Sequence, residues 1–310
     1  MNAHTMAGTG GPTALQRYSA TASSSARVVI TRYSTSFSLA CRLLGSPARE
    51  DISNIYALVR LADEVVDGVA REAGLEAREV AAALEQLEAE TEAALASGYS
   101  TNMIVHAFAC TARSRGIDTE LTRPFFASMR SDLQVASHDA ETLKGYIYGS
   151  AEVVGLMCLR VFGSMPGAPA GHEAETEAAA RSLGAAFQKV NFLRDLAADT
   201  SELGRSYFPG LDPRTFSDEH KNALVREIRA DLDAAALGIE HLAPGAARAV
   251  AMAHGLFSEL NHRIERTPAA ELMTRRISVP PGRKALIALR TALGRRPTTA
   301  TATSATKGRP

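Results

Sequence analysis

Two pairs of aspartates carry the strongest chemical signal in this sequence. Asp63 and Asp67 lie four residues apart in LADEVVDGV, and Asp195 and Asp199 lie four residues apart in FLRDLAADT. In an α-helix this spacing puts both carboxylates of a pair on one face. A single pair of this kind is usually part of a solvated surface, so its neighbours must decide what it does.

The neighbours extend each pair into a polar stripe on an otherwise apolar helix. Tyr56 and Arg60 share the face of the first pair, and Gln188 and Asn191 share the face of the second. The remaining faces are largely apolar, with Leu58, Val59, Leu61, Val65 and Val66 on one helix and Phe187, Val190, Leu193 and Leu196 on the other. A helix with this pattern is expected to line a polar cavity inside a bundle.

Four carboxylates that share a cavity repel one another unless cations neutralise them. Mg²⁺ prefers oxygen ligands and usually shares its coordination sphere with phosphate oxygens, and Mn²⁺ could take the same ligands. The two stripes therefore predict a diphosphate substrate that is held by magnesium between two helices.

Hydroxyl and basic side chains elsewhere fit such a substrate. Tyr33-Ser34-Thr35-Ser36-Phe37 puts hydroxyls at an expected helix start, where backbone N–H groups favour anions, although ordinary capping explains them equally well. Counter-charge for a leaving diphosphate is expected from Lys189, Arg194, Arg205, Arg275 and Arg276. His106 and His138 have no partner at ligand spacing and are interpreted as structural or surface residues.

A third stretch, YIYGSAEVVG at residues 146–155, puts small residues along a helix. These residues could open room for a long hydrocarbon chain. A close crossing of two helices would explain the glycines equally well.

The elements that must position these residues are helices. The chain between its ends is rich in Ala, Leu, Glu and Arg, and its breaks fall at Gly and Pro. We expect an all-α fold with one helical domain over residues 26–295. Ser46 is predicted to cap the helix of the first aspartate pair, with Pro47 in its first turn. Residues 1–25 and the basic segment 296–310 lack an apolar period and are predicted to be disordered.

Composition excludes some classes of function. The 34 basic and 34 acidic side chains cancel, so net charge does not predict a nucleic-acid partner.

From Leu272 onward there are nine Lys or Arg residues and no acidic residue, and GRKALIALRTALGRR is amphipathic. That helix could lie on an anionic membrane or pack onto the bundle. With no secretory signal and no long apolar run, we expect a cytoplasmic protein that could contact the inner face of the membrane peripherally.

These residues resemble the squalene and phytoene synthase family, the head-to-head prenyl synthases. The matching segments run in family order from about residue 28 to about residue 290 and read YSTSFSLACRLL, IYALVRLADEVVDG, YIYGSAEVVGLMCLRVFG, AFQKVNFLRDLAADTSELGRSYFP and RRISVP. The resemblance implies a class I isoprenoid synthase helical bundle with a central cavity. In contrast to eukaryotic squalene synthases, this sequence is expected to lack a C-terminal transmembrane anchor.

The resemblance implies roles for individual residues. Asp63, Asp67, Asp195 and Asp199 match the two aspartate-rich motifs that bind magnesium, and Tyr146 matches an active-site tyrosine. The positions that match diphosphate-binding residues are Ser34, Ser36, Arg60, Gln188, Asn191, Arg205, Tyr207 and Arg276. The second motif departs from the family because Ala198 stands where Glu often precedes the final Asp. Both metal-binding aspartates remain, so activity is expected to survive.

Within the family, the sequence looks most like bacterial phytoene synthases. These join two geranylgeranyl diphosphates through a cyclopropyl (prephytoene) diphosphate to form phytoene, and they need no nicotinamide. A squalene or dehydrosqualene synthase, which uses two farnesyl diphosphates, is the nearest alternative. A non-catalytic scaffold would have no reason to keep four carboxylates in a cavity, and a helical nucleotide phosphohydrolase would show Glu-x-x-Glu pairs that these stripes lack. The sequence leaves the oligomeric state open.

Overall fold

The fold is built from helices. The computed structural model describes residues 11–135, 137–201, 207–208 and 215–293, without the side chains of residues 198–201. Across these ranges no β-strand is found, so the predicted all-α fold is confirmed. In chain order the helices are α1 (Ala14–Tyr33), α2 (Thr35–Cys41), α3 (Ser46–Val66), α4 (Val69–Glu72), α5 (Ala77–Ser97), α6 (Met103–Arg115), α7 (Thr119–Gln134), α8 (Ala140–Ile147), the π-helical turn η1 (Tyr148–Glu152), α9 (Val153–Gly163), α10 (Glu173–Ser201), α11 (Asp218–Gly238), the 3-10 turn η3 (Ile239–His241), α12 (Pro244–Arg266), α13 (Ala269–Leu272) and α14 (Pro281–Ala292).

Local sequence signals define the helix ends. The Asn102 side chain accepts hydrogen bonds from the first free N–H groups of α6, and the Asp139 side chain does the same for α8. Gly98 and Gly116 end α5 and α6 in the left-handed conformation, which glycine adopts without a steric penalty. At α3 the cap is Gly45, so Ser46 and Pro47 lie in the first turn instead of at the cap position that the sequence predicted for Ser46.

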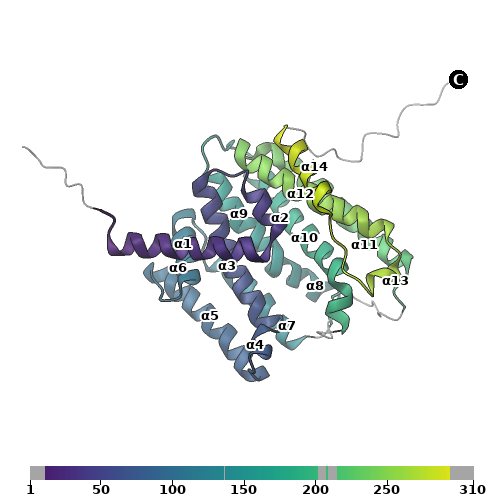
Figure 1. The fold of residues 1–310 in the computed structure, drawn as a ribbon, viewed down its shortest axis with the longest axis horizontal. Helices are drawn as coiled ribbons and strands as arrows, with labels where there is room; N and C mark the ends of the chain where they lie inside the picture. Colours follow the sequence, from purple (N-terminus) through teal and green to yellow (C-terminus); the bar gives the residue numbers. More distant parts are fainter. Residues whose placement is uncertain (1–10, 136, 202–206, 209–214, 294–310) are drawn as a thin grey trace, which may run out of the picture.

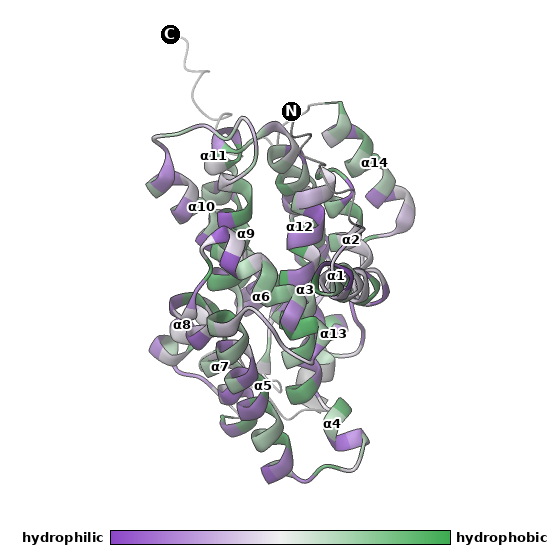
Figure 2. Ribbon diagram, turned by 90° about the vertical axis from the view of Figure 1, so that its left-hand side faces the viewer, coloured by the Kyte–Doolittle hydropathy of each residue, from purple (hydrophilic) through white to green (hydrophobic). Residues whose placement is uncertain are grey.

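Two large hydrophobic clusters fill the bundle. The first joins α3, α5, α6, α7 and α9 around fully buried side chains such as Phe108, Phe125 and Phe126. The second joins α8, α10, α11 and α12 around Leu193 and Ile228. Figure 1 shows α10 with α9 and α11 close by, and these helices pack against one another. Figure 2 shows hydrophobic and hydrophilic residues alternating along most helices, as expected where each helix turns one face to a core.

The structure corrects the N-terminal boundary. The sequence predicts a disordered segment over residues 1–25, but α1 begins at Ala14, so the prediction is wrong for residues 14–25. Figure 1 shows α1 extending along one side of the bundle. Its buried contacts with α3 and α6 come from small side chains, namely Ala22, Ala26, Ala57 and Ala107. Such side chains let helices approach closely without the large apolar residues that a periodicity search detects. Residues 1–10 and 294–310 lie outside the described residues.

The last described helix, α14, packs on α2 and α12 through Ile287 and Ala288. Its other face exposes leucines at positions 286, 289 and 293. No helix in the described ranges is both long enough and apolar enough to cross a bilayer.

Candidate active site

A cavity of about 900 Å³ lies between the two hydrophobic clusters. It brings together eleven of the thirteen residues that the sequence singled out, namely Ser34, Ser36, Arg60, Asp63, Asp67, Tyr146, Gln188, Asn191, Asp195, Tyr207 and Arg276. Of the other two, Asp199 is in the last turn of α10 and its side chain is not described, and Arg205 lies outside the described residues.

The first acidic wall is the C-terminal end of α3. Asp67 caps the helix, and its backbone N–H donates to the Asp63 carbonyl at 2.8 Å, so the two residues stay one helical turn apart. Burial, followed by the negative charge of Asp67, raises the pKa of Asp63 to about 7, while Arg60 opposes this shift and Asp132 adds to it. A cation bound here would relieve the repulsion between these carboxylates.

Arg60 lies almost one turn before Asp63 on the same face. It forms an ion pair with Glu64, and its guanidinium lies over the Tyr33 ring, 4.6 Å from the ring centroid. These contacts hold a cationic side chain at the edge of the acidic wall.

The second wall is the polar stripe of α10. The Oδ1 atom of Asn191 is buried and has no hydrogen-bond partner within the described part of the chain. Asp195 has two arginine partners, because Arg194 Nε donates to its Oδ1 at 3.0 Å and Arg276 Nε lies 2.7 Å from the same oxygen. Arg276 comes from the segment between α13 and α14, so a third part of the chain completes this wall.

The donor types on both walls suit a hard divalent cation. The carboxylates of Asp63, Asp67 and Asp195 and the unpartnered amide oxygen of Asn191 are all oxygen donors. Among the described residues, no group of three or more Asp, Glu, His or Cys side chains lies close enough together to hold a metal ion. The Asp199 side chain is not described and so is not included in this statement. A cation held by these walls would therefore take further oxygens from its own ligand, as Mg²⁺ does from phosphate groups.

The sequence analysis missed Asp132, a buried carboxylate that also lines the cavity. Its Oδ2 accepts a hydrogen bond from the Tyr146 hydroxyl at 2.8 Å, and its Oδ1 accepts one from the Tyr207 hydroxyl at 3.1 Å. His138 is buried beside both tyrosine rings, with centroid distances of 5.0 Å to Tyr146 and 6.1 Å to Tyr207. A signal for Asp132 was present, since it follows Phe125 and Met129 at the spacing of a buried helical stripe.

The hydroxyl segment at the start of α2 shows the capping role, while its role in anion binding stays a prediction. Ser34 is the N-cap of α2, and its Oγ accepts from the Phe37 N–H at 3.1 Å. Ser34 and Ser36 also line the cavity, and Lys284 of α14 reaches it with Nζ 2.9 Å from the Thr35 hydroxyl.

Gly155 of α9 and Gly184 of α10 lie at close helix crossings. A Cβ at Gly155 would lie 2.6 Å from the Ala180 carbonyl oxygen, and a Cβ at Gly184 would lie 2.6 Å from the Ala151 carbonyl oxygen. Gly155 and Gly184 also line the cavity. The close helix crossing and the space for a hydrocarbon chain, which the sequence left as alternatives, therefore occur at the same glycines.

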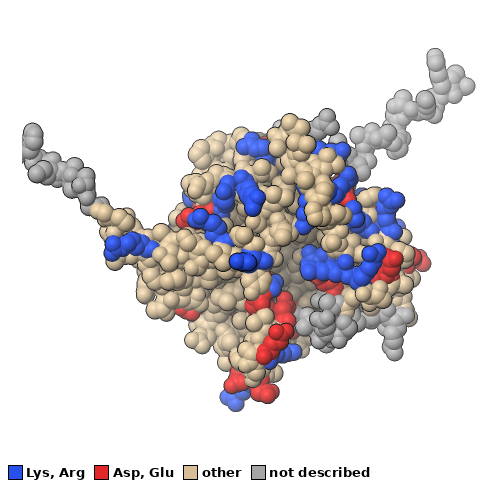
Figure 3. All heavy atoms as spheres, viewed as in Figure 1, with Lys and Arg blue, Asp and Glu red and all other residues tan. Residues whose placement is uncertain are grey.

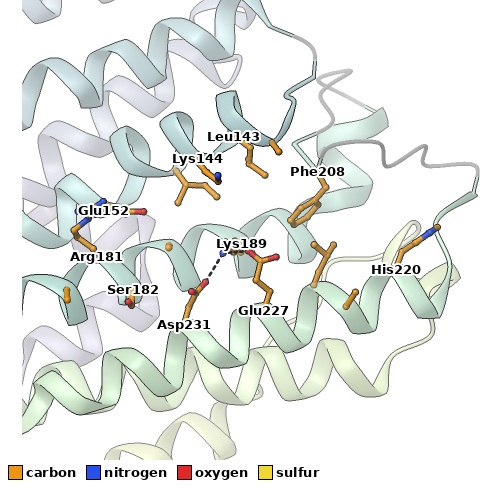
Figure 4. A pocket seen from close by; sticks show the side chains of 16 residues that line it. Leu143, Lys144, Glu152, Arg181, Ser182, Lys189, Phe208, His220, Glu227 and Asp231 are labelled. Carbon is orange, nitrogen blue, oxygen red and sulfur yellow. Dashed lines mark hydrogen bonds and ion pairs between the residues drawn. The ribbon is translucent and has the colours of Figure 1, made fainter. Parts of the chain in front are cut away.

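Two of the expected counter-charges lie elsewhere. Lys189 lines a separate cavity of about 810 Å³ between α8, α10 and α11, as Figure 4 shows, where its Nζ donates to Asp231 at 2.8 Å and forms an ion pair with Glu227. On a helix, residue 189 is rotated by about 100° from Gln188, which explains why it faces away from the polar stripe. Arg275 is exposed and pairs with Glu271 at 2.6 Å, so the expectation is wrong for both residues.

The arrangement combines an ionic end with a long apolar interior. Acidic residues from α3 and α10 and arginines from three segments meet at one end, and Figure 3 shows acidic and basic side chains close together near the middle of the face viewed. The rest of the cavity is lined mainly by apolar and small side chains from α2, α9, α10, α11 and α12. Such a site can hold the charged group of a ligand at one end and a hydrocarbon chain along its length.

Comparisons with known proteins agree with this geometry. The sequence model of the squalene/phytoene synthase family matches residues 30–283 of this chain. A 15-cis-phytoene synthase from Paracoccus sp. is 29% identical over 265 residues, which cover 80% of this chain and 84% of the relative.

Solved structures show the same fold at low sequence identity. A dehydrosqualene synthase matches with a TM-score of 0.70 and 19% identity, over 90% of this chain and 98% of that chain. A squalene synthase from Alicyclobacillus acidocaldarius matches with a TM-score of 0.68 and 20% identity, over 80% of this chain and 94% of that chain. The isoprenoid synthase helical fold implied by the sequence is therefore confirmed. Because the family match spans most of the chain, this protein belongs to the squalene/phytoene synthase family.

Proposed function

We propose that this chain is a phytoene synthase that condenses two geranylgeranyl diphosphates head to head in carotenoid biosynthesis. The observation that carries the proposal is the shared cavity, in which Asp63 and Asp67 on α3 and Asp195 on α10 line one otherwise largely apolar space. This is the arrangement that a substrate with a diphosphate head and a long hydrocarbon tail requires.

The length of the cavity accommodates a C20 substrate. Its lining residues on α10 run from Thr176 to Asp195, and at 1.5 Å per residue these nineteen steps span about 28 Å. The sixteen-carbon main chain of a geranylgeranyl group extends roughly 20 Å when built from C–C bonds of about 1.5 Å. The name of the Paracoccus relative, 15-cis-phytoene synthase, supports the same substrate.

Magnesium is proposed as the cofactor, and Mn²⁺ as a substitute. Asp63, Asp67, Asp195 and Asp199 would hold it, and bound Mg²⁺ neutralises a diphosphate and makes it a better leaving group. The oxygen donors on both walls, the raised pKa of Asp63 and the unpartnered Asn191 oxygen support this assignment.

The side chains of the protein act on the charges of the reaction. Arg60, Arg194 and Arg276 balance the negative charge of the diphosphates at the ionic end, where the hydroxyls of Ser34 and Ser36 are available as hydrogen-bond donors. The first C–O bond breaks, and diphosphate leaves with the bonding electrons. The resulting allylic cation is attacked by a double bond of the second substrate, and loss of one proton gives the cyclopropyl diphosphate.

The second half of the reaction takes place in the same cavity. The cyclopropyl diphosphate loses its diphosphate, its carbon skeleton rearranges, and a second proton is lost to give phytoene. Two substrates thus yield one hydrocarbon, two diphosphates and two protons, so no hydride donor and no nicotinamide is required. Apolar side chains such as Ile55, Phe187 and Phe257 exclude the water that would otherwise capture the cations.

The proposal includes peripheral contact with a membrane. On α14 the exposed leucines alternate with Arg283 and Arg290, a pattern suited to an anionic lipid surface. Lys284 of the same helix lines the cavity, so this contact would bring the site close to a lipid-dissolved substrate or product.

A competition experiment tests the substrate. Purified protein is incubated with Mg²⁺ and equal amounts of labelled C15 and C20 diphosphates, and the hydrocarbons formed are separated by chain length. The proposal predicts phytoene as the main product. A C30 product alone would replace it with a squalene or dehydrosqualene synthase activity.

A further inference from the structure

A cluster of three donor atoms lies between α1 and α6. Cys110 follows His106 by four residues on α6, so both side chains share one face of that helix, a pairing that the sequence analysis overlooked. Ser19 reaches the pair from α1. The His106 Nε2 atom lies 2.9 Å from the Ser19 Oγ and 3.5 Å from the Cys110 Sγ, and the Sγ and the Oγ are 3.9 Å apart. These three described residues do not line the cavity of the proposed reaction, so the cluster is a separate feature of the molecule.

The imidazole of His106 is held in place and presents one nitrogen to this cluster. The ring is fully buried, and it meets the rings of Tyr18 and Tyr99 edge to face, with centroid distances of 4.8 Å and 5.7 Å. Its Nδ1 has no hydrogen-bond partner within the described part of the chain, so the polar contacts of the ring are made by Nε2. Burial lowers the pKa of His106, which keeps the ring neutral at neutral pH, and neutral imidazole is the form that binds metals.

The spacing of the three donor atoms fits one metal ion bound to all of them. Zinc lies about 2.3 Å from a Cys sulfur and about 2.0–2.2 Å from a His nitrogen or an oxygen ligand. At these bond lengths the observed separations correspond to angles at the metal of about 107° between Sγ and Nε2, about 125° between Sγ and Oγ, and about 89° between Nε2 and Oγ. The mean of these angles is close to tetrahedral, so one ion can contact all three atoms without a movement of the backbone.

The donor types select a metal other than magnesium. Thiolate and imidazole ligands favour Zn²⁺ over hard cations, which prefer oxygen, so this cluster and the acidic walls would take different ions. Only two residues of the cluster are of the usual zinc-binding types, and the third donor is a neutral hydroxyl. Ser19 and Cys110 are half-buried, so solvent can supply a water as the fourth ligand.

We propose that His106, Cys110 and Ser19 form a metal site that binds Zn²⁺ and ties α1 to α6. As the bond from Sγ to the metal forms, the Cys110 thiol loses its proton to solvent, while Nε2 and Oγ each contribute a lone pair and Nδ1 keeps the proton of the neutral ring. The packing of α1 otherwise relies on small side chains such as Ala22 and Ala26, so a metal link would stabilise a helix with few large apolar contacts. The inference goes beyond the proposed function and does not depend on it.

Cobalt serves as the spectroscopic probe of this site. Co²⁺ takes the same ligands as Zn²⁺, and a thiolate bound to it adds a charge-transfer band in the near ultraviolet, where a chain without tryptophan absorbs little. The purified full chain is titrated in excess Mg²⁺, which occupies sites made of oxygen donors. We expect the band to appear with one Co²⁺ per chain and to disappear when Zn²⁺ is added. Absence of the band at saturating Co²⁺ would overturn the proposal.

Substitutions assign the band to individual side chains. Cys110→Ala should abolish it, and Cys110→Ser should weaken Zn²⁺ binding by at least about tenfold, because a neutral hydroxyl replaces a thiolate. Ser19→Ala should cause a smaller loss, since a hydroxyl is the weakest of the three donors. Cys158→Ala is the matched control and should keep the band, because that thiol lines the cavity and burial raises its pKa to about 12. A band that survives in Cys110→Ala, or that is lost in Cys158→Ala, would overturn the assignment.

Hydrogen exchange tests the link between the two helices. In the parent, Zn²⁺ should slow the exchange of backbone amides in α1 around Ser19, relative to the same protein with a chelator. In Cys110→Ala the exchange should be the same with Zn²⁺ and with the chelator, and the chelated samples show whether the substitution itself loosens α1. Exchange in α1 that Zn²⁺ leaves unchanged in the parent would contradict the proposed tie.

Discussion

Arg276 lies against Asp195, with its Nε 2.7 Å from the Oδ1 of that carboxylate, although the two residues are 81 positions apart in the sequence. The arginine is two-thirds exposed, at 67%, while the aspartate is at 23%. In the absence of substrate the pair balances charge on the second wall. Under the proposed function, the same guanidinium would reach a diphosphate bound between the walls, and Arg276 would link substrate binding to a carboxylate that is proposed to hold the metal.

Replacement of Arg276 should therefore weaken substrate binding more than folding. Arg276→Ala is expected to raise KM for the prenyl diphosphate by about tenfold, because a cation that contacts the anionic head is lost. The melting temperature should change little, since exposed ion pairs contribute only about 0–1 kcal/mol. Arg275→Ala is the matched control, because this neighbour pairs with Glu271 and does not line the cavity. Equal effects of the two substitutions on KM would exclude a special role for Arg276.

Asp63 predicts a pH dependence of stability in the metal-free protein. Its pKa is raised from 3.8 to about 7, so the folded state keeps a proton that the unfolded state releases over this range. The contribution of Asp63 to stability is therefore lost progressively as the pH rises from about 3.8 to about 7. In the presence of a chelator, Asp63→Asn should melt at a higher temperature than the parent at pH 8, with a smaller gain at pH 5. A gain that is the same at both pH values would show that Asp63 ionises normally.

The close helix crossing at Gly155 predicts a cost for any side chain there. A Cβ at this position would lie 2.6 Å from the backbone oxygen of Ala180, which cannot move independently of α10. Gly155→Ala should lower the free energy of unfolding by about 1–3 kcal/mol, as overpacking does. Gly163→Ala provides the control, since a Cβ at Gly163 meets open space. Denaturant titration of both variants measures the difference, and equal midpoints would contradict the crossing.

The exposed leucines of α14 predict lipid binding. Substitution of Leu289 and Leu293 by Ser should reduce sedimentation with vesicles of phosphatidylglycerol and phosphatidylcholine, and added salt should reduce it further through the arginines. Leu237→Ser on α11 removes a comparably exposed leucine from another surface and should have no effect. Unchanged sedimentation of the double variant would remove α14 as the contact.

Much of the fold and site follows from helical periodicity. The spacing of Asp63 with Asp67, and of Gln188 with Asn191 and Asp195, was sufficient to predict two polar stripes, and the structure finds both in one cavity. The same rule also shows why Lys189 was misplaced, because one residue of rotation carries it to the neighbouring face of α10.

Other features depend on tertiary contacts that periodicity does not encode. The N-terminal part of α1 is stabilised by the close approach of small residues, such as Ala22 and Ala26, which resemble a disordered composition. Asp132 lies within an apolar stripe of α7, and its hydrogen bonds with Tyr146 and Tyr207 form only because the fold brings these residues to it from other elements.

The most direct measurement is product analysis with labelled geranylgeranyl diphosphate, with Mg²⁺ and with a chelator, for the parent and for Asp63→Asn and Asp195→Asn. The facing acidic walls predict that the parent with Mg²⁺ releases two diphosphates for each C40 hydrocarbon formed, and that chelation or either substitution reduces this yield by at least about a hundredfold. A parent that forms no C40 hydrocarbon, or variants that form as much as the parent, would contradict the account.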